Sequence, residues 1–69
     1  MTETVTLTER QLEVLRMFAE GYSYKDIADE LKVSPGTIQV VRTAIVEKLA
    51  ATNIIHAVVK AIKLGIITP

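Results

Sequence analysis

Apolar residues recur at three- and four-residue steps along most of this chain, which is the spacing of one face of an α-helix. The longest such series predicts a helix that begins at Ser34-Pro35. The serine hydroxyl can cap the helix, and proline suits a first turn in which its missing N–H is not needed. The apolar stripe of this helix consists of Ile38, Val41, Ile45 and Leu49.

A shorter helix is predicted directly before it. Ser23 can cap this helix, and Asp26 stands three residues later, where it can complete a capping box. Lys32-Val33 ends the helix, so that a turn of about 3–4 residues separates the two helices, which is typical of a helix-turn-helix. The motif spans residues 23–49, and its first helix has a narrow apolar face made of Ile27, Ala28 and Leu31.

The residues before this motif predict one more helix. Thr8 can cap it together with Gln11, Leu7 can pack on Leu12, and Gly21 can end it in a left-handed conformation. The inward face is expected to contain Leu12, Leu15, Met17, Phe18 and Ala19. The outward face is expected to contain Glu9, Arg10, Glu13, Arg16 and Glu20.

A fourth helix is predicted from a cap at Thr52 or Asn53 to about Leu64, with Gly65 ending it. Its residues are apolar around nearly the whole circumference, although one small domain can cover only part of that surface. The uncovered part therefore predicts a partner, most simply a second copy of this chain. The residues expected in this homodimer contact are Ile55, Val59, Ile62 and Ile66.

Composition agrees with one all-α domain. The 69 residues are 49% hydrophobic but only 4% aromatic, so stability depends on dense aliphatic packing. The chain has no cysteine, and His56 alone cannot hold a metal, so neither a metal site nor a cofactor is expected. We expect residues 1–6 to be a flexible arm and residues 7–69 to form the domain of a small stand-alone protein. No signal peptide or membrane span is evident, which predicts a cytoplasmic protein without membrane contact.

Charge is unevenly distributed along the chain. The formal net charge is zero, which is unusual for a protein that binds nucleic acid. Residues 1–30, however, carry seven acidic and three basic side chains, whereas residues 31–69 carry five basic and one acidic side chain. The basic half contains the longer helix of the helix-turn-helix, so that a DNA contact remains compatible with the charge.

The segment LTERQLEVLRMFAEGYSYKDIADELKVSPGTIQ resembles the start of the LuxR/GerE-type DNA-binding domain, and the likeness extends from Leu7 to Ile67. It implies an all-α fold, a four-helix helix-turn-helix domain whose third helix enters the major groove and whose fourth commonly forms the dimer contact. Sigma factor region 4 is a more distant resemblance, to the first half only. The residues in register with the family are Leu7, Thr8, Glu13, Val14, Leu15, Gly21, Lys25, Ile27, Ala28, Leu31, Ser34, Thr37, Ile45, Lys48, Leu49, Asn53 and Ala57.

The chain departs from the family pattern on the third and fourth helices. The family usually has lysine and histidine where this chain has Gln39 and Val41, and often a basic residue in place of Thr43. It often has Arg-Thr in place of Ile54-Ile55. The third helix therefore lacks cationic groups that the resemblance implies, and the fourth has a larger apolar surface.

Candidate DNA contacts follow from position. Ser34 and Thr37 lie at the start of the third helix, where hydroxyl and backbone N–H groups suit a phosphate. Simple capping is the alternative for both residues, and for Ser34 it is the better explanation. Gln39 can bond adenine, and Val40 can pack on a thymine methyl group. The remaining candidates are Lys25 and Lys48 for phosphates, and Arg42 and Thr43 for bases or phosphates.

Two functions remain open at this stage. The favoured one is a DNA-binding transcriptional regulator, bacterial or phage, that acts as a homodimer on double-stranded DNA. The alternative is a helix-turn-helix-derived module that sequesters a transcription factor or an RNA polymerase subunit through its apolar fourth helix. An enzyme is not expected, because the sequence offers no nucleophile–base pair, no carboxylate pair and no glycine-rich phosphate loop.

Overall fold

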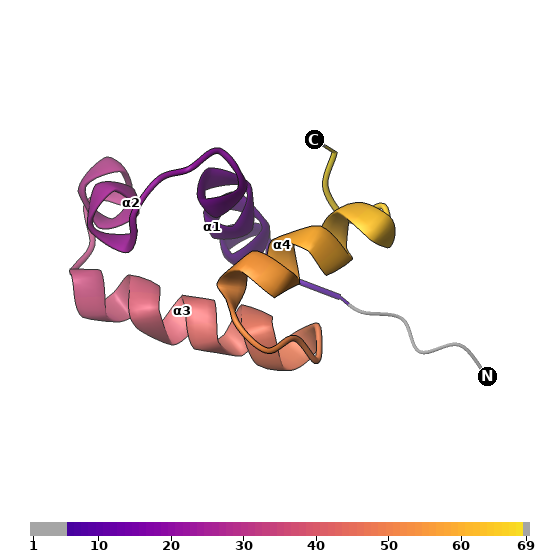
Figure 1. The fold of residues 1–69 in the computed structure, drawn as a ribbon. Helices are drawn as coiled ribbons and strands as arrows, with labels where there is room; N and C mark the ends of the chain where they lie inside the picture. The colour runs from indigo at the N-terminus through magenta and orange to yellow at the C-terminus, as the bar shows by residue number, and fades with distance from the viewer. Residues whose placement is uncertain (1–5, 69) are drawn as a thin grey trace.

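Four α-helices joined by short turns make up residues 6–68, the part of the chain that the computed structural model describes. The third helix lies along one side of the domain, and the other three cover one flank of it (Figure 1). The second and fourth helices pack at opposite ends of the third, and the first lies between them. This arrangement confirms the all-α, four-helix expectation. The helices are α1 (Glu9–Ala19), α2 (Tyr24–Leu31), α3 (Pro35–Lys48) and α4 (Ile54–Lys63).

Side-chain caps begin the helices where the sequence predicts them. In α1 the Gln11 N–H donates to Thr8 Oγ1 at 3.1 Å, and the Thr8 N–H donates to Gln11 Oε1 at 3.0 Å, a complete capping box. Ser23 and Asp26 form the same box at the start of α2. Of the two candidates for α4, Asn53 is the cap, because its Oδ1 accepts the His56 N–H at 2.9 Å.

A left-handed residue stands at the end of each of the four helices, and after α3 it is Ala50, with φ 52°. Gly21 follows α1 with φ +97° and Gly65 follows α4 with φ +75°, as expected for glycine after a helix. Lys32 ends α2 with φ 59°, a conformation that costs a residue with a Cβ atom free energy. The chain therefore accepts strain at the one turn that sets the angle between α2 and α3.

The core is entirely aliphatic and lies between α1 and the inner faces of the other helices. Three of the four stripe residues of α3 are almost fully buried, and Val41 is half-buried. The residues predicted to face outward on α1 are all exposed, which confirms that face. The buried residues are Leu7, Val14, Leu15, Ile27, Ala28, Ile38, Ile45, Leu49, Ala57, Ala61 and Ile67.

The predicted inward face of α1 was wrong at one residue and incomplete at another. Ala19 is exposed, whereas Val14, which the prediction left out, is completely buried. Helical residues are about 100° apart, so the buried arc centres between Val14 and Leu15 and also includes Phe18. Ala19 lies about 90° from that centre and is exposed, whereas the longer side chains of Leu12 and Met17, about 110° from it, are half-buried.

Most of the residues expected to form the N-terminal arm are not among those that the structure describes. Five of the six residues assigned to the arm, and Pro69 at the other end, lie outside the described residues. None of the helices within residues 6–68 combines the length and hydrophobicity needed to cross a lipid bilayer.

Candidate nucleic-acid interface

The turn between α2 and α3 consists of three residues, within the predicted range. Lys32 adopts the left-handed conformation, and the Val33 N–H donates to the Ala28 carbonyl at 3.0 Å, which closes the end of α2. Ser34 then caps α3, with Pro35 as the first helical residue. Each residue of this turn thus takes part in a cap or a backbone hydrogen bond, and α2 and α3 pack against each other.

The outer side of α3 is exposed opposite its buried stripe. Gln39 and Thr43 are exposed, and the side chain of Val40 is 70% exposed. Arg42 is half-buried at the edge of this face. The face is slightly hollow, with an open depression of about 460 Å³. The residues that line it are Gln39, Val40, Arg42, Thr43, Ala44 and Glu47, which we call the α3 outer face.

The two hydroxyl groups at the start of α3 bond to each other. Ser34 Oγ accepts the Thr37 N–H at 3.3 Å and lies 3.0 Å from Thr37 Oγ1. Both residues are exposed. Ser34 is thereby accounted for by capping, whereas the Thr37 hydroxyl retains lone pairs or a proton for an external group.

The hydroxyl of Thr43 also has a partner inside the protein. Thr43 Oγ1 donates to the Gln39 carbonyl at 3.0 Å, one turn earlier in α3. Its proton is used in this bond, so toward a ligand the side chain offers an acceptor oxygen and a methyl group.

The two candidate lysines differ in their surroundings. Lys25 is exposed at the second position of α2. Lys48 is exposed at the last position of α3, and its Nζ donates to Gln11 Oε1 at 2.9 Å and to the Thr6 carbonyl at 3.3 Å. The predicted phosphate ligand is therefore also a link between α3 and α1.

Three residues of this region received no role from the sequence. Ala44 and Glu47 line the α3 outer face, and Glu47 is one helical turn beyond Thr43. Gly36, in the first turn of α3, leaves open space, because a Cβ placed there would meet only Ser34 Oγ, at 3.9 Å. Helical spacing already places Glu47 on the same face as Gln39 and Thr43, although the sequence assigned the carboxylate no role.

The residues assigned to dimerisation lie on α4 and just beyond it. Ile55 is 74% exposed and Val59 is 42% exposed, whereas Ile62 and Ile66 are half-buried. Leu64, which the sequence did not nominate, is 59% exposed. Ile55 and Val59 are one turn apart, so they form a continuous exposed apolar strip along α4.

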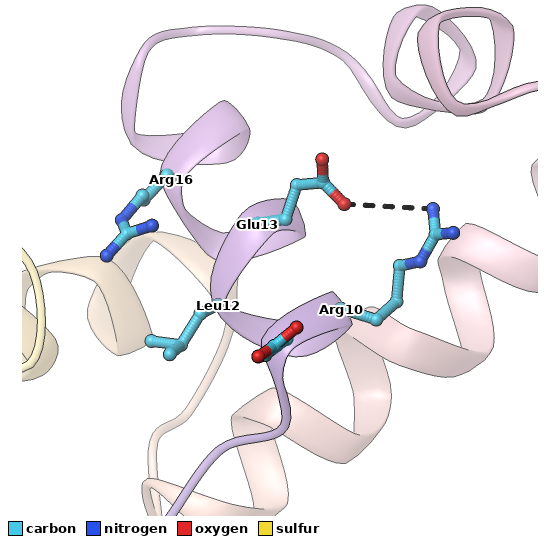
Figure 2. Close-up of a pocket in the computed structure, with 5 residues that line it drawn as sticks. Arg10, Leu12, Glu13 and Arg16 are labelled. Carbon is cyan, nitrogen blue, oxygen red and sulfur yellow. Dashed lines mark ion pairs between the residues drawn. The ribbon is translucent and has the colours of Figure 1, made fainter.

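A larger depression, of about 610 Å³, lies on the outward face of α1. Figure 2 shows its labelled side chains, with Arg10 and Glu13 paired across it at 3.8 Å. It is lined almost wholly by exposed charged residues of both signs, which is what a solvated helix face presents. We assign it no function, and the candidate interface remains the α3 outer face.

This geometry agrees with a comparison against known families. The family of bacterial regulatory proteins called the luxR family matches residues 5–61 of this chain. The chain belongs to the luxR family. The resemblance noted in the sequence is thereby confirmed.

Relatives and a solved structure support the assignment to the luxR family. The methanol utilization control regulatory protein MoxX of Paracoccus denitrificans is 42% identical over 62 residues, which are 90% of this chain and 28% of MoxX. The transcriptional regulatory protein DesR of Bacillus subtilis is 38% identical over 64 residues, which are 93% of this chain and 32% of DesR. The structure of the transcription factor GerE matches with a TM-score of 0.82 and 28% identity, covering 91% of this chain and 92% of GerE.

The chain spans about a third or less of the length of these two regulators, whereas it matches GerE over nearly its full length. What is shared with the luxR family is therefore the helix-turn-helix domain of a transcriptional regulator. The family consists of DNA-binding regulators and not of enzymes.

Proposed function

We propose that this chain binds double-stranded DNA as a homodimer, with α3 in the major groove, and that it thereby regulates transcription. The observation that carries the proposal is the division of α3 into two sides. Ile38 and Ile45 are buried against the domain, whereas Gln39, Val40 and Thr43 are exposed together on the opposite side. A recognition helix needs this division, because its outer residues must reach base edges while its inner residues anchor it.

The groups on the α3 outer face suit A·T-rich sequence. A glutamine amide can bond both N6 and N7 of adenine, and exposed aliphatic groups such as Val40 pack on the thymine methyl group. Arg42 is long enough to reach a base or a phosphate from the edge of the face. Lys25 and Thr37 lie at the starts of α2 and α3, where helix N-termini suit phosphate oxygens.

The small number of cationic side chains makes a dimer important for this mode of binding. Few cationic groups surround the α3 outer face, so each chain neutralises about three or four phosphates and binds non-specific DNA weakly at physiological salt. Two linked domains on adjacent half-sites multiply their affinities through effective concentration. The exposed strip of Ile55 and Val59 on α4 supports the proposal that a second copy packs there.

A salt titration tests the DNA-binding part of the proposal. The protein is mixed with sheared mixed-sequence DNA, and the binding constant is measured at several salt concentrations. A linear fall of log affinity with log salt is expected, with a slope of about −0.9 for each phosphate neutralised. Absence of binding even at low salt would contradict DNA binding.

The second candidate function is sequestration of a transcription factor or an RNA polymerase subunit without DNA binding. The zero net charge, the uncharged Gln39 and Val41, and the exposed apolar strip on α4 favour it. In that case α4 would contact the partner rather than a second copy. The same titration separates the two functions, because this one predicts no DNA complex at any salt concentration.

A further inference from the structure

The carboxylate of Glu47 lies among the residues that are proposed to face DNA. Successive helical residues are about 100° apart, so Glu47 projects from α3 in a direction between those of Thr43 and Val40. It lines the α3 outer face together with these two residues and is itself exposed. An acidic side chain is therefore part of the surface that the proposed function places against the duplex.

This carboxylate has no partner within the part of the chain that the structure describes. Within residues 6–68 the one ion pair is that of Arg10 with Glu13, and no hydrogen bond involves the Glu47 carboxylate. Glu47 is also the penultimate residue of α3, where the helix dipole disfavours a negative charge. The helix therefore gains no electrostatic stabilisation from Glu47, and no direct contact within these residues neutralises its charge.

The position of Glu47 along α3 brings it to the edge of the major groove when the helix is inserted. In a helix-turn-helix the N-terminal part of the recognition helix contacts the base edges. Glu47 lies about 12 Å beyond Gln39 along the helix axis, a distance close to the width of the major groove. When Gln39 lies at the bases, the DNA groups nearest to Glu47 are therefore the phosphates that border the groove.

We propose that Glu47 limits the affinity of this domain for DNA, because its carboxylate repels the phosphates that pass the C-terminal end of α3. The proposal rests on the proposed function, since it supposes that α3 lies in the major groove. The repulsion acts on every phosphate alike, so it lowers the affinity for all sequences and leaves sequence preference to residues such as Gln39 and Val40. A single chain then binds weakly, and stable binding requires two chains on adjacent half-sites.

Glu47→Gln tests the proposal, because it removes the charge and keeps the size of the side chain. Binding to a random-sequence duplex and to a selected site is measured at several salt concentrations. On both duplexes we expect binding roughly two- to fivefold tighter per bound chain at low salt, and a salt slope steeper by about one. The gain should shrink as salt is added, because salt screens the repulsion. The melting temperature without DNA should be unchanged or slightly higher, since the carboxylate has no partner to lose.

Glu20→Gln is the matched control for the change in net charge. Glu20 is exposed on the side of α1 opposite its buried residues, so the same substitution there removes a charge that lies away from the α3 outer face. It should leave the binding constants and the salt slope unchanged. Equal gains from Glu47→Gln and Glu20→Gln would show an effect of net charge alone, and the role of Glu47 would be wrong.

The other outcomes distinguish this proposal from the proposed function. If the original chain binds DNA and Glu47→Gln binds no more tightly, Glu47 lies outside the DNA contact and the proposal is wrong. If Glu47→Gln weakens binding to the selected site alone, the carboxylate accepts a hydrogen bond from a base, such as cytosine N4, and the repulsive role is again wrong. If neither chain shows salt-dependent binding, the proposed function itself fails, and this inference fails with it.

Discussion

At the scale of single residues, two kinds of group surround the α3 outer face. Gln39 and Val40 project away from the domain and carry groups that differ in their fit to different bases. Lys25 lies at the start of α2 and offers only charge, which every phosphate accepts equally. Sequence preference and overall affinity should therefore respond to different substitutions.

Gln39→Ala should weaken binding to the preferred site by about 1–3 kcal/mol, because the bidentate contact with adenine is lost. Its effect on random DNA should be small. Lys25→Ala should weaken binding to both duplexes alike and flatten the salt slope by about one, because it removes one phosphate contact. Fluorescence anisotropy on a selected site and on a random duplex, at several salt concentrations, measures both effects.

The assignment of these roles can be refuted directly. Equal losses for Gln39→Ala on the two duplexes would mean that Gln39 does not read sequence. A selective loss for Lys25→Ala on the preferred site would mean that Lys25 contributes more than charge. Val40→Ala provides a further check, since it should weaken only sites with a thymine methyl group opposite α3.

At the scale of helices, the sequence predicted those features that depend on residues close together in the chain. The caps at Thr8, Ser23 and Ser34 were predictable because donor and acceptor are three residues apart in the chain. The link between Lys48 and Gln11 was not, because these residues are 37 positions apart and meet only once α1 and α3 pack. Helical spacing predicted the exposed side of α1, but it misplaced Ala19 and left out the buried Val14.

The left-handed turn after α2 offers a test of stability. Lys32 has φ 59°, where glycine has no steric penalty, so Lys32→Gly should raise the free energy of unfolding by about 0.5–1 kcal/mol. The expected stabilisation is smaller than the strain energy that is removed. This is because glycine also increases the conformational entropy of the unfolded chain. For a domain of this size, 1 kcal/mol corresponds to about 4–8 °C in melting temperature.

Thermal or urea unfolding followed by circular dichroism measures this gain. Lys32→Ala is the matched control, since it removes the same charge but keeps a Cβ atom in the strained conformation. It should not stabilise the domain. If both variants raise the melting temperature equally, loss of the lysine charge explains the effect, and the strain at Lys32 is not a significant cost.

At the scale of the whole molecule, the charge separation seen in the sequence can be followed from helix to helix. The acidic residues belong mainly to α1 and α2, whereas all but one of the charged residues of α3 and α4 are basic. The exception is Glu47, on the α3 outer face itself. The position of this carboxylate was predictable from helical spacing. Its effect on DNA affinity was not, because that effect depends on how close the DNA phosphates pass to Glu47.

The exposed apolar strip on α4 leads to the last prediction, which concerns assembly. Burial of one large aliphatic side chain contributes roughly 1.5–3 kcal/mol, so a few of them per chain suffice for association in the micromolar range after the entropy cost. Analytical ultracentrifugation at roughly tens of micromolar should therefore show a dimer. Val59→Glu should convert it to a monomer, because a charge buried in an apolar contact without a partner is strongly unfavourable.

Val40→Glu is the matched control for this prediction. Val40 is another exposed valine, but it lies on α3 and outside the proposed contact, so the same substitution there should leave the dimer intact. Circular dichroism should show that both variants remain folded, since both side chains point to solvent in the single chain. A monomeric original protein, or dissociation by both substitutions alike, would rule out α4 as the dimer contact, and Ile55 and Val59 would then be available to a different protein partner.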